Sequence, residues 1–189
     1  MKTAKANAAV IDSYLQEECA AARISCPDER RAAEAYISPM GVIPKAHQPG
    51  RWRLIVDLSS PCAASVNDGI APNLCSLSYV SIDVAARKIC ELGTGAMMTK
   101  LDIQSAYRHI PVHPDNRHLL GMSWKGKVYL DRALPIGLPL APKIVSAVAD
   151  ALMWIMSCRG ITAAIHYLDD FLFFGRPQAS ECDENLQKH

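Results

Sequence analysis

The sequence lacks the features that mark secreted, disulfide-stabilised and membrane-spanning proteins. Its seven cysteines form no Cys-x-x-Cys pair and are odd in number, which predicts free thiols and a reducing compartment. The N-terminal residues contain no continuous apolar segment of the kind found in signal peptides. The longest apolar-looking stretch, residues 133–156, contains three prolines, Lys143 and Asp150, so we expect no transmembrane helix there. These absences predict an intracellular protein, cytoplasmic or nuclear, without a membrane partner.

The chain also lacks a strong excess of charge of either sign. Its formal net charge of +1 gives no overall indication of a nucleic-acid partner. The charges are unevenly distributed, because residues 38–60 carry three basic and one acidic side chain, and residues 96–134 carry six basic and three acidic ones. Such a basic middle segment can attract phosphates, although weak patches are more often ordinary solvated surface.

What the sequence does have is enough apolar residues for a folded core. Half of its 189 residues are hydrophobic, which suits one domain or two closely associated subdomains. Periodicity and turn residues predict helices over residues 5–23, 28–36, 81–92 and 140–158, strands over 96–103 and 126–134, and a strand–turn–strand unit over 38–60. Residues 60–79, rich in Ser, Pro, Cys and Asn, are expected to form a loop.

Two familiar motifs are incomplete. The segment "GMSWKGKV" (121–128) has the glycine and lysine spacing of a P-loop, but Val128 stands where a Ser or Thr should bind magnesium. A strand-like run follows it instead of a helix, so we expect a β-turn. The histidines His109, His113 and His118 have loosely metal-like spacing, but no cysteine or second histidine pair completes a zinc site.

The segment "IHYLDDFLFFG" (165–175) carries Asp169 and Asp170 inside a run of branched and aromatic residues. Neighbouring residues on a continuous strand point to opposite faces, so both carboxylates can face one site only if the chain turns there. A hairpin with the pair at its tip would satisfy the geometry, and a divalent cation would satisfy the charge. A solvated turn is the alternative, because Asp is an ordinary turn residue.

Asp102, in "TKLDIQSAYRHIPV", is the best candidate for a third carboxylate. Like Asp169, it follows an apolar strand segment at the point where the strand gives way to a turn. If the two strands were neighbours in one sheet, Asp102 would lie beside the hairpin tip. Three carboxylates in that arrangement could hold two divalent ions for displacement at phosphorus.

The order of four motifs resembles that of reverse transcriptases. The segments "KLDIQSAYR" (100–108), "LPIGLPLAP" (134–142) and "YLDD" (167–170) are similar to the palm motifs of that family, and "WRLIVDL" (52–58) is similar to its fingers motif. The pattern over residues 38–175, with the lead-in "SPMGVIPK", resembles retrotransposon polymerases. The resemblance implies an α+β fold with fingers and palm, the palm having a ferredoxin-like antiparallel sheet packed on helices.

The resemblance also assigns roles around the aspartates. It implies that Asp102, Asp169 and Asp170 are catalytic and bind two Mg2+ or Mn2+ ions, with the backbone carbonyl of Ile103 assisting. Tyr167 and Leu168 fall on the primer-side hairpin positions.

The nucleotide pocket follows from the same resemblance. Tyr107 resembles the aromatic gate beneath the incoming sugar, with a half-buried helical tyrosine as the alternative. Arg53 matches the arginine that grips the triphosphate and Lys45 lies close to the fingers lysine, although each could be a strand-edge charge. Strand alternation places Arg53 on the face opposite Trp52, Leu54 and Val56. Gly137 and Pro142 match the segment that lines the nucleotide pocket.

This sequence departs from the family at two points. Ile136 replaces the glutamine or aromatic residue of other members, so side-chain contacts to the sugar at that position are in question. Beyond the hairpin we find no counterpart of the thumb or the ribonuclease H domain. The expected organisation is an N-terminal helical extension (1–37), fingers (38–95), palm (96–176, with 113–131 returning to the fingers) and a truncated stub (177–189).

The leading interpretation is DNA synthesis from deoxynucleoside triphosphates on an RNA or DNA template with a primer, by a retroelement enzyme that is an incomplete copy. The alternative is an inactive nucleic-acid-binding remnant of such an enzyme. A metal-dependent phosphohydrolase of another fold would explain the aspartates, but it would not explain Tyr107, Arg53 or the "LPIGLPLAP" segment. Sequence gives no oligomeric state.

Overall fold

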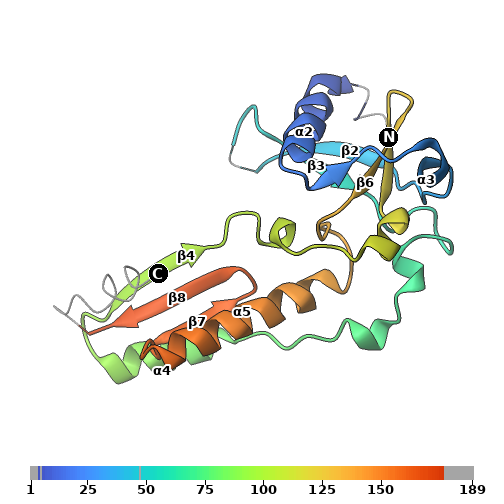
Figure 1. Cartoon of the computed structure of the whole chain (residues 1–189). Helices are drawn as coiled ribbons and strands as arrows, with labels where there is room; N and C mark the ends of the chain where they lie inside the picture. The colour runs from blue at the N-terminus through green and yellow to red at the C-terminus, as the bar shows by residue number, and fades with distance from the viewer. Residues whose placement is uncertain (1–3, 5, 47, 177–189) are drawn as a thin grey trace. The chain divides into compact units, whose positions relative to one another are not determined.

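The chain folds into two compact units in a computed structural model that describes residues 4, 6–46 and 48–176 (Figure 1). Unit 1 is formed by residues 1–75 and 107–141, and unit 2 by residues 76–106 and 142–189. The predicted stub at 177–189 lies outside the described residues. Each unit therefore combines two separate stretches of the chain.

Unit 1 has two small antiparallel sheets and a helix packed against them. Its helices are α2 (Ala8–Ala20) and α3 (Glu29–Ala33), and its strands are β1 (Ile24–Ser25), β2 (Met40–Pro44), β3 (Trp52–Val56), β5 (Gly121–Trp124) and β6 (Lys127–Asp131). One sheet has the order β1-β6-β5, and β2 pairs with β3 in the other. The core contains residues from α2, β1, β2 and β5, namely Ile11, Leu15, Ile24, Met40, Val42 and Met122.

A buried ionic cluster ties α2 to β6. The guanidinium of Arg108 lies 2.7 Å from Glu18 Oε2 on α2 and 2.6 Å from Asp131 Oδ1 at the end of β6. Arg23 adds a second contact to Glu18, at 2.6 Å. Burial raises the pKa of Asp131 to about 6, although the Arg108 guanidinium opposes that shift. Burial acts in the same sense on Glu18, but hydrogen bonds from Arg23 and Arg108 outweigh it, so the pKa of Glu18 is lowered.

Unit 2 is an antiparallel sheet packed on helices. Its strands are β4 (Met97–Asp102), β7 (Ala164–Tyr167) and β8 (Asp170–Gly175), in the order β4-β8-β7. The helices are α4 (Ile82–Leu92), which contacts β8, and α5 (Ala141–Cys158), which Figure 1 shows running alongside the sheet. Ala149, Met156, Phe171 and Phe173 form the core between α5 and one face of the sheet.

Helix α5 carries apolar side chains on an exposed side as well as on the side that packs against the sheet. Val148, Leu152 and Ile155 lie on a side of the helix that is exposed, at helical spacing. By length and composition alone the helix is long and apolar enough to cross a membrane, a property that the core helices of soluble proteins can share. Pro142 occupies its first turn, as the sequence predicts.

The mixture of helices and antiparallel sheets confirms the predicted α+β class. The strand–turn–strand unit over 38–60 is the β2–β3 hairpin, and "GMSWKGKV" forms the β5–β6 hairpin with its turn at Lys125 and Gly126, as expected. The expected loop over 60–79 contains two short 3₁₀ helices, Asn67–Gly69 and Pro72–Leu74. Leu54 and Val56 pack against the core of unit 1 while Arg53 is exposed, which agrees with the predicted alternation, but Trp52 at the start of the strand is exposed as well.

Candidate active site

The two aspartates of "YLDD" lie at a tight hairpin. Tyr167, the last residue of β7, pairs with Asp170, the first residue of β8, so Leu168 and Asp169 form a two-residue tip. Leu168 has a φ of 56°, in the left-handed region that a residue with a Cβ rarely adopts. Strain of this kind tends to occur at functional sites, where the surrounding structure enforces it. The predicted hairpin is present, but its tip is formed by Leu168 and Asp169, one residue earlier than expected, and Asp170 opens β8.

Asp102 lies directly beside this tip. It is the residue opposite Asp170 in the antiparallel pairing of β4 with β8, and opposed residues point to the same face of a sheet. The next residue, Ile103, donates its backbone N–H to the carbonyl oxygen of Asp169 at 3.1 Å. Residues 102–103 and 169–170 are thus held together by the backbone itself.

The face that carries Asp102 and Asp170 is the one turned away from α5. Their neighbours Leu101 and Phe171 oppose one another on the other face, where they belong to the core formed with the helix. Asp102 is exposed and Asp170 half-buried, so neither carboxylate is fully removed from solvent. Alternation along the strands thus explains how two strands built for burial also carry carboxylates.

A lysine occupies the same face, two residues before Asp102. Lys100 Nζ lies 3.0 Å from Asp170 Oδ2. A hydrogen bond to Asp170 and the charge of Asp170 raise the pKa of Lys100, and the charges of Asp102 and Asp169 add to the effect. The contact is at the surface, where solvent weakens it. It shows that Asp170 holds a cation at this position.

The donor set suits a hard divalent cation such as Mg2+, which prefers carboxylate oxygens. Asp102 and Asp170 are opposed on one face, and Asp170 already contacts an ammonium group, so both fit such a cation. Among the described residues, however, no set of three or more His, Cys, Asp or Glu side chains is gathered closely enough to hold a metal ion. The close cluster of all three carboxyl groups therefore stays a prediction.

Two further sets of contacts, not foreseen from the sequence, hold the hairpin tip. The ring of His166 lies between two acceptors, with Nδ1 3.2 Å from the carbonyl oxygen of Leu168 and Nε2 2.9 Å from Asp150 Oδ1 on α5. Tyr79 stacks on Tyr167, with ring centroids 4.8 Å apart. The sequence did carry a signal for His166. It directly precedes Tyr167 in the strand, so alternation places its side chain on the opposite face, toward α5.

The predicted triphosphate contacts Lys45 and Arg53 share one face of the β2–β3 hairpin. Arg53 is opposite Ile43, and the backbone N–H of Lys45 continues the ladder by donating to the carbonyl oxygen of Arg51 at 2.9 Å. Because Lys45 is two residues beyond Ile43, it lies on the same face as Arg53. Two cations on one outward face suit binding of a polyanion.

The remaining predicted pocket residues lie in both units. Gly137 has a φ of 111°, which only glycine adopts readily, and its carbonyl oxygen accepts a hydrogen bond from Asn67 Nδ2 at 3.1 Å. Tyr107 is half-buried in a 3₁₀ helix, Ala106–His109. Lys45, Arg53, Tyr107 and Gly137 belong to unit 1, whereas Pro142 and the aspartates belong to unit 2. Their shared role around one nucleotide stays a prediction.

Comparison with known proteins identifies the family of this chain. The family model described as reverse transcriptase (RNA-dependent DNA polymerase) matches residues 43–189, which include all of the predicted site residues. The chain belongs to the reverse transcriptase family. This is a family of RNA-directed DNA polymerases, and the match confirms the resemblance to reverse transcriptases drawn from the four motifs.

Individual relatives cover this reverse transcriptase chain to different extents. Protein P of duck hepatitis B virus (strain United States/DHBV-16) is 32% identical over 81 residues, which are 43% of this chain and 10% of the viral protein. The solved protease-reverse transcriptase of prototype foamy virus has a TM-score of 0.69 at 21% identity, covering 95% of this chain and 21% of the viral chain.

The foamy viral enzyme has also been solved with nucleic acid. Its complex with double-stranded DNA matches with a TM-score of 0.67 at 17% identity, over 100% of this chain and 28% of that chain. Its complex with an RNA/DNA hybrid matches with a TM-score of 0.68 at 18% identity, over 97% of this chain and 22% of that chain. At these identities the likeness confirms the fold. The chain spans under a third of the length of these solved relatives.

Proposed function

We propose that this chain carries the fingers and palm of a retroelement reverse transcriptase, which copies an RNA or DNA template into DNA from deoxynucleoside triphosphates. The observation that supports this most directly is the register that sets Asp102 opposite Asp170 beside the two-residue tip. A hydrolase site of another fold would not need the reverse transcriptase motifs around this pair.

In this proposal Asp102, Asp169 and Asp170 hold two Mg2+ or Mn2+ ions, with the carbonyl of Ile103 as a further ligand. When bound, such ions supply Lewis acidity for attack of a primer 3′-hydroxyl on the α-phosphate and neutralise charge on the leaving pyrophosphate. The chain itself contributes the fixed spacing of the carboxylates, which the β4–β8 pairing sets.

The other predicted residues bind and orient the nucleotide. Lys45 and Arg53 share the face of one hairpin and would take the triphosphate, with Arg53 offering paired donors to phosphate oxygens. Tyr107 would exclude a ribose 2′-hydroxyl by its bulk. Gly137 and Pro142 would line the pocket, and Tyr167 and Leu168 would position the primer end.

Template and primer are the proposed macromolecular partners. The foamy viral relatives solved with double-stranded DNA and with an RNA/DNA hybrid support this choice. Binding mainly through phosphates should weaken as salt is raised, because condensed counterions are released when phosphates are neutralised. The alternative, a non-catalytic nucleic-acid-binding remnant, would keep that salt dependence and lose nucleotide addition.

Direct measurement of metal binding tests the site without relying on catalysis. We expect Asp102→Asn and Asp170→Asn each to weaken Mn2+ binding, followed by electron paramagnetic resonance, by about tenfold or more, since even residues that only support ligands cost that much. Asp83→Asn, an exposed carboxylate on α4, is the matched control and should bind Mn2+ as the parent does. If all three variants bound Mn2+ with the same affinity, the proposed metal site would be ruled out.

Primer extension then separates the two functions. The chain is assayed with Mg2+ or Mn2+, alone and extended by a reverse transcriptase thumb, on an RNA template. Extension that depends on Asp102 and Asp170 supports polymerisation. Template binding without any extension, in a protein that binds Mn2+ normally, supports the non-catalytic alternative.

A further inference from the structure

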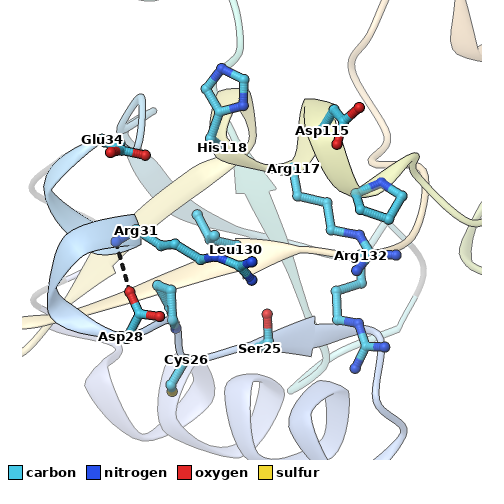
Figure 2. A pocket seen from close by; sticks show the side chains of 12 residues that line it. Ser25, Cys26, Asp28, Arg31, Glu34, Asp115, Arg117, His118, Leu130 and Arg132 are labelled. Carbon is cyan, nitrogen blue, oxygen red and sulfur yellow. Dashed lines mark hydrogen bonds between the residues drawn. The ribbon is translucent and has the colours of Figure 1, made fainter.

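Unit 1 contains a pocket of about 490 Å3 that the reverse transcriptase motifs do not use (Figure 2). Three arginines from separate segments line it: Arg31 on α3, Arg117 in the 3₁₀ helix Pro114–Leu119, and Arg132 just after β6. Figure 2 shows their side chains extending toward the same space, with the hydroxyl oxygen of Ser25 directed into it. All of the lining residues belong to unit 1.

The arginines are held in place by the fold. The backbone N–H of Arg31 donates to Asp28 Oδ1 at 2.9 Å, which caps α3. Arg117 Nε donates to the carbonyl oxygen of Val112 at 3.0 Å, and the N–H of Val112 donates to the carbonyl oxygen of Arg132 at 2.8 Å. One backbone residue, Val112, thus links Arg117 to Arg132.

None of the three guanidinium groups has an acidic partner within 4.0 Å in the part of the chain that the structure describes. Three carboxylates also line the pocket, but none lies within 4.0 Å of these guanidinium groups. Asp28 caps α3, Glu34 lies 3.4 Å from Arg30, and Asp115 lies 3.6 Å from His113 Nδ1. The pocket therefore gathers three unpaired cations whose mutual repulsion an anion would relieve.

We propose that this pocket binds a phosphate group. A guanidinium presents its donors in a planar fork that fits phosphate oxygens in pairs, and three such forks around one space exceed what a single carboxylate can use. The volume lies within the range of pockets for organic ligands and is larger than a bare phosphate needs. There is room for the sugar or base attached to the phosphate.

Two sources share this chemistry, a nucleic-acid strand and a free nucleotide or pyrophosphate. They are distinguished by titrating the 189-residue chain with a single-stranded oligodeoxythymidylate, with deoxythymidine triphosphate and with inorganic pyrophosphate. For a strand, the slope of log affinity against log salt should become shallower by about 0.7 for each phosphate whose arginine is replaced. A small phosphate should saturate the pocket without needing a strand.

The test compares Arg31→Gln and Arg132→Gln with Lys127→Gln. Lys127 is an exposed residue of β6 outside the pocket, so its substitution removes the same charge from the same unit. We expect each arginine variant to weaken the tightest of the three ligands by about tenfold, as loss of a charged hydrogen bond does, and the lysine variant to bind as the parent does. Arg132→Lys should recover only part of the affinity, because an ammonium cannot replace the fork.

Nuclear magnetic resonance gives a second measurement that does not depend on affinity. Ligand-induced shifts of backbone amides should concentrate at residues 25–34, 114–118 and 130–132, and unchanged thermal unfolding should show that the variants are folded. Shifts confined to other residues would overturn the proposal. So would equal weakening in Lys127→Gln, which would indicate attraction by general charge only.

Discussion

Lys100 Nζ lies 3.0 Å from Asp170 Oδ2, on the sheet face that also carries Asp102. A lysine in this position neutralises part of the charge that the opposed carboxylates would otherwise present to one another. It also occupies the place where a metal ion is proposed to bind. The lysine and the metal ion should therefore compete for the same oxygens.

Lys100→Gln should raise the affinity of the chain for Mn2+ severalfold, because a metal ion no longer has to displace an ammonium group. The effect should be modest, since solvent screens a pair this exposed. Arg159→Gln, which removes an exposed cation of unit 2 beyond the end of α5, is the control. Manganese titration followed by electron paramagnetic resonance measures both, and equal gains in the two variants would point to net charge alone.

Tyr107→Val should raise incorporation of ribonucleotides in a thumb-bearing enzyme, because a smaller side chain leaves space for the 2′-hydroxyl. The measurement is the ratio of kcat/KM for a ribonucleotide to that for the matching deoxynucleotide. Tyr107→Phe keeps the ring and should retain the parental ratio. An unchanged ratio in the valine variant would return Tyr107 to a packing role in its 3₁₀ helix.

His166→Phe should loosen the hairpin tip while keeping the aromatic contact with Phe171, whose ring centroid is 5.7 Å away. The ring nitrogens contact Leu168 and Asp150, and each hydrogen bond contributes about 0.5–1.5 kcal/mol. We expect faster amide hydrogen exchange at residues 168–170. The comparison variant Asp150→Asn removes the carboxylate but leaves the bond to Leu168, so its effect on exchange should be smaller.

Because of Asp131, the free energy of unfolding of unit 1 should fall as the pH rises from about 4 to about 6. Its pKa is raised from 3.8 to about 6 by burial, so in this window the folded state binds more protons than the unfolded state. Stability then decreases with pH by up to roughly 3 kcal/mol and becomes flat above the folded pKa. Denaturant titrations of the parent and of Asp131→Asn, from pH 4 to pH 7, give the difference, which should follow this course.

The control for this prediction is the sign of the slope. Glu18 has a lowered pKa, so it stabilises the folded state at pH values above its pKa in the unfolded chain. Its contribution to the free energy of unfolding therefore rises with pH and is lost as the pH falls. Taking the difference between parent and Asp131→Asn removes most of the Glu18 contribution. A difference that grew in favour of the parent between pH 4 and pH 6 would contradict the prediction.

The β4–β8 relationship could be anticipated from the sequence because it depends on local patterns. Asp102 and Asp169 each follow an apolar run and precede a turn, and the hairpin requirement follows from two adjacent carboxylates. Alternation along "WRLIVDL" likewise placed Arg53 on the face away from the core. These inferences need only the two-residue period of a strand.

Other features could not be anticipated, because they join segments that are distant in sequence. The contact of His166 with Asp150 depends on the packing of α5 against the sheet, and the pocket brings together arginines at positions 31, 117 and 132. Pairing of Lys100 with Asp170 depends on which side-chain rotamers the charges favour. No period or motif in one stretch of sequence specifies such meetings.

Helix α2 belongs to unit 1 although it lies outside the residues that match the family. The family match begins at residue 43, yet Ile11 and Leu15 are buried in the core of unit 1, and Glu18 is one of the two carboxylates paired with Arg108. A polypeptide trimmed to the matched residues would lose α2 and most of β2, with the buried Met40 and Val42, and would leave Arg108 short of a counter-charge. The segment before the match thus supplies most of the buried residues in this core cluster of unit 1, and trimming studies of this protein should keep α2.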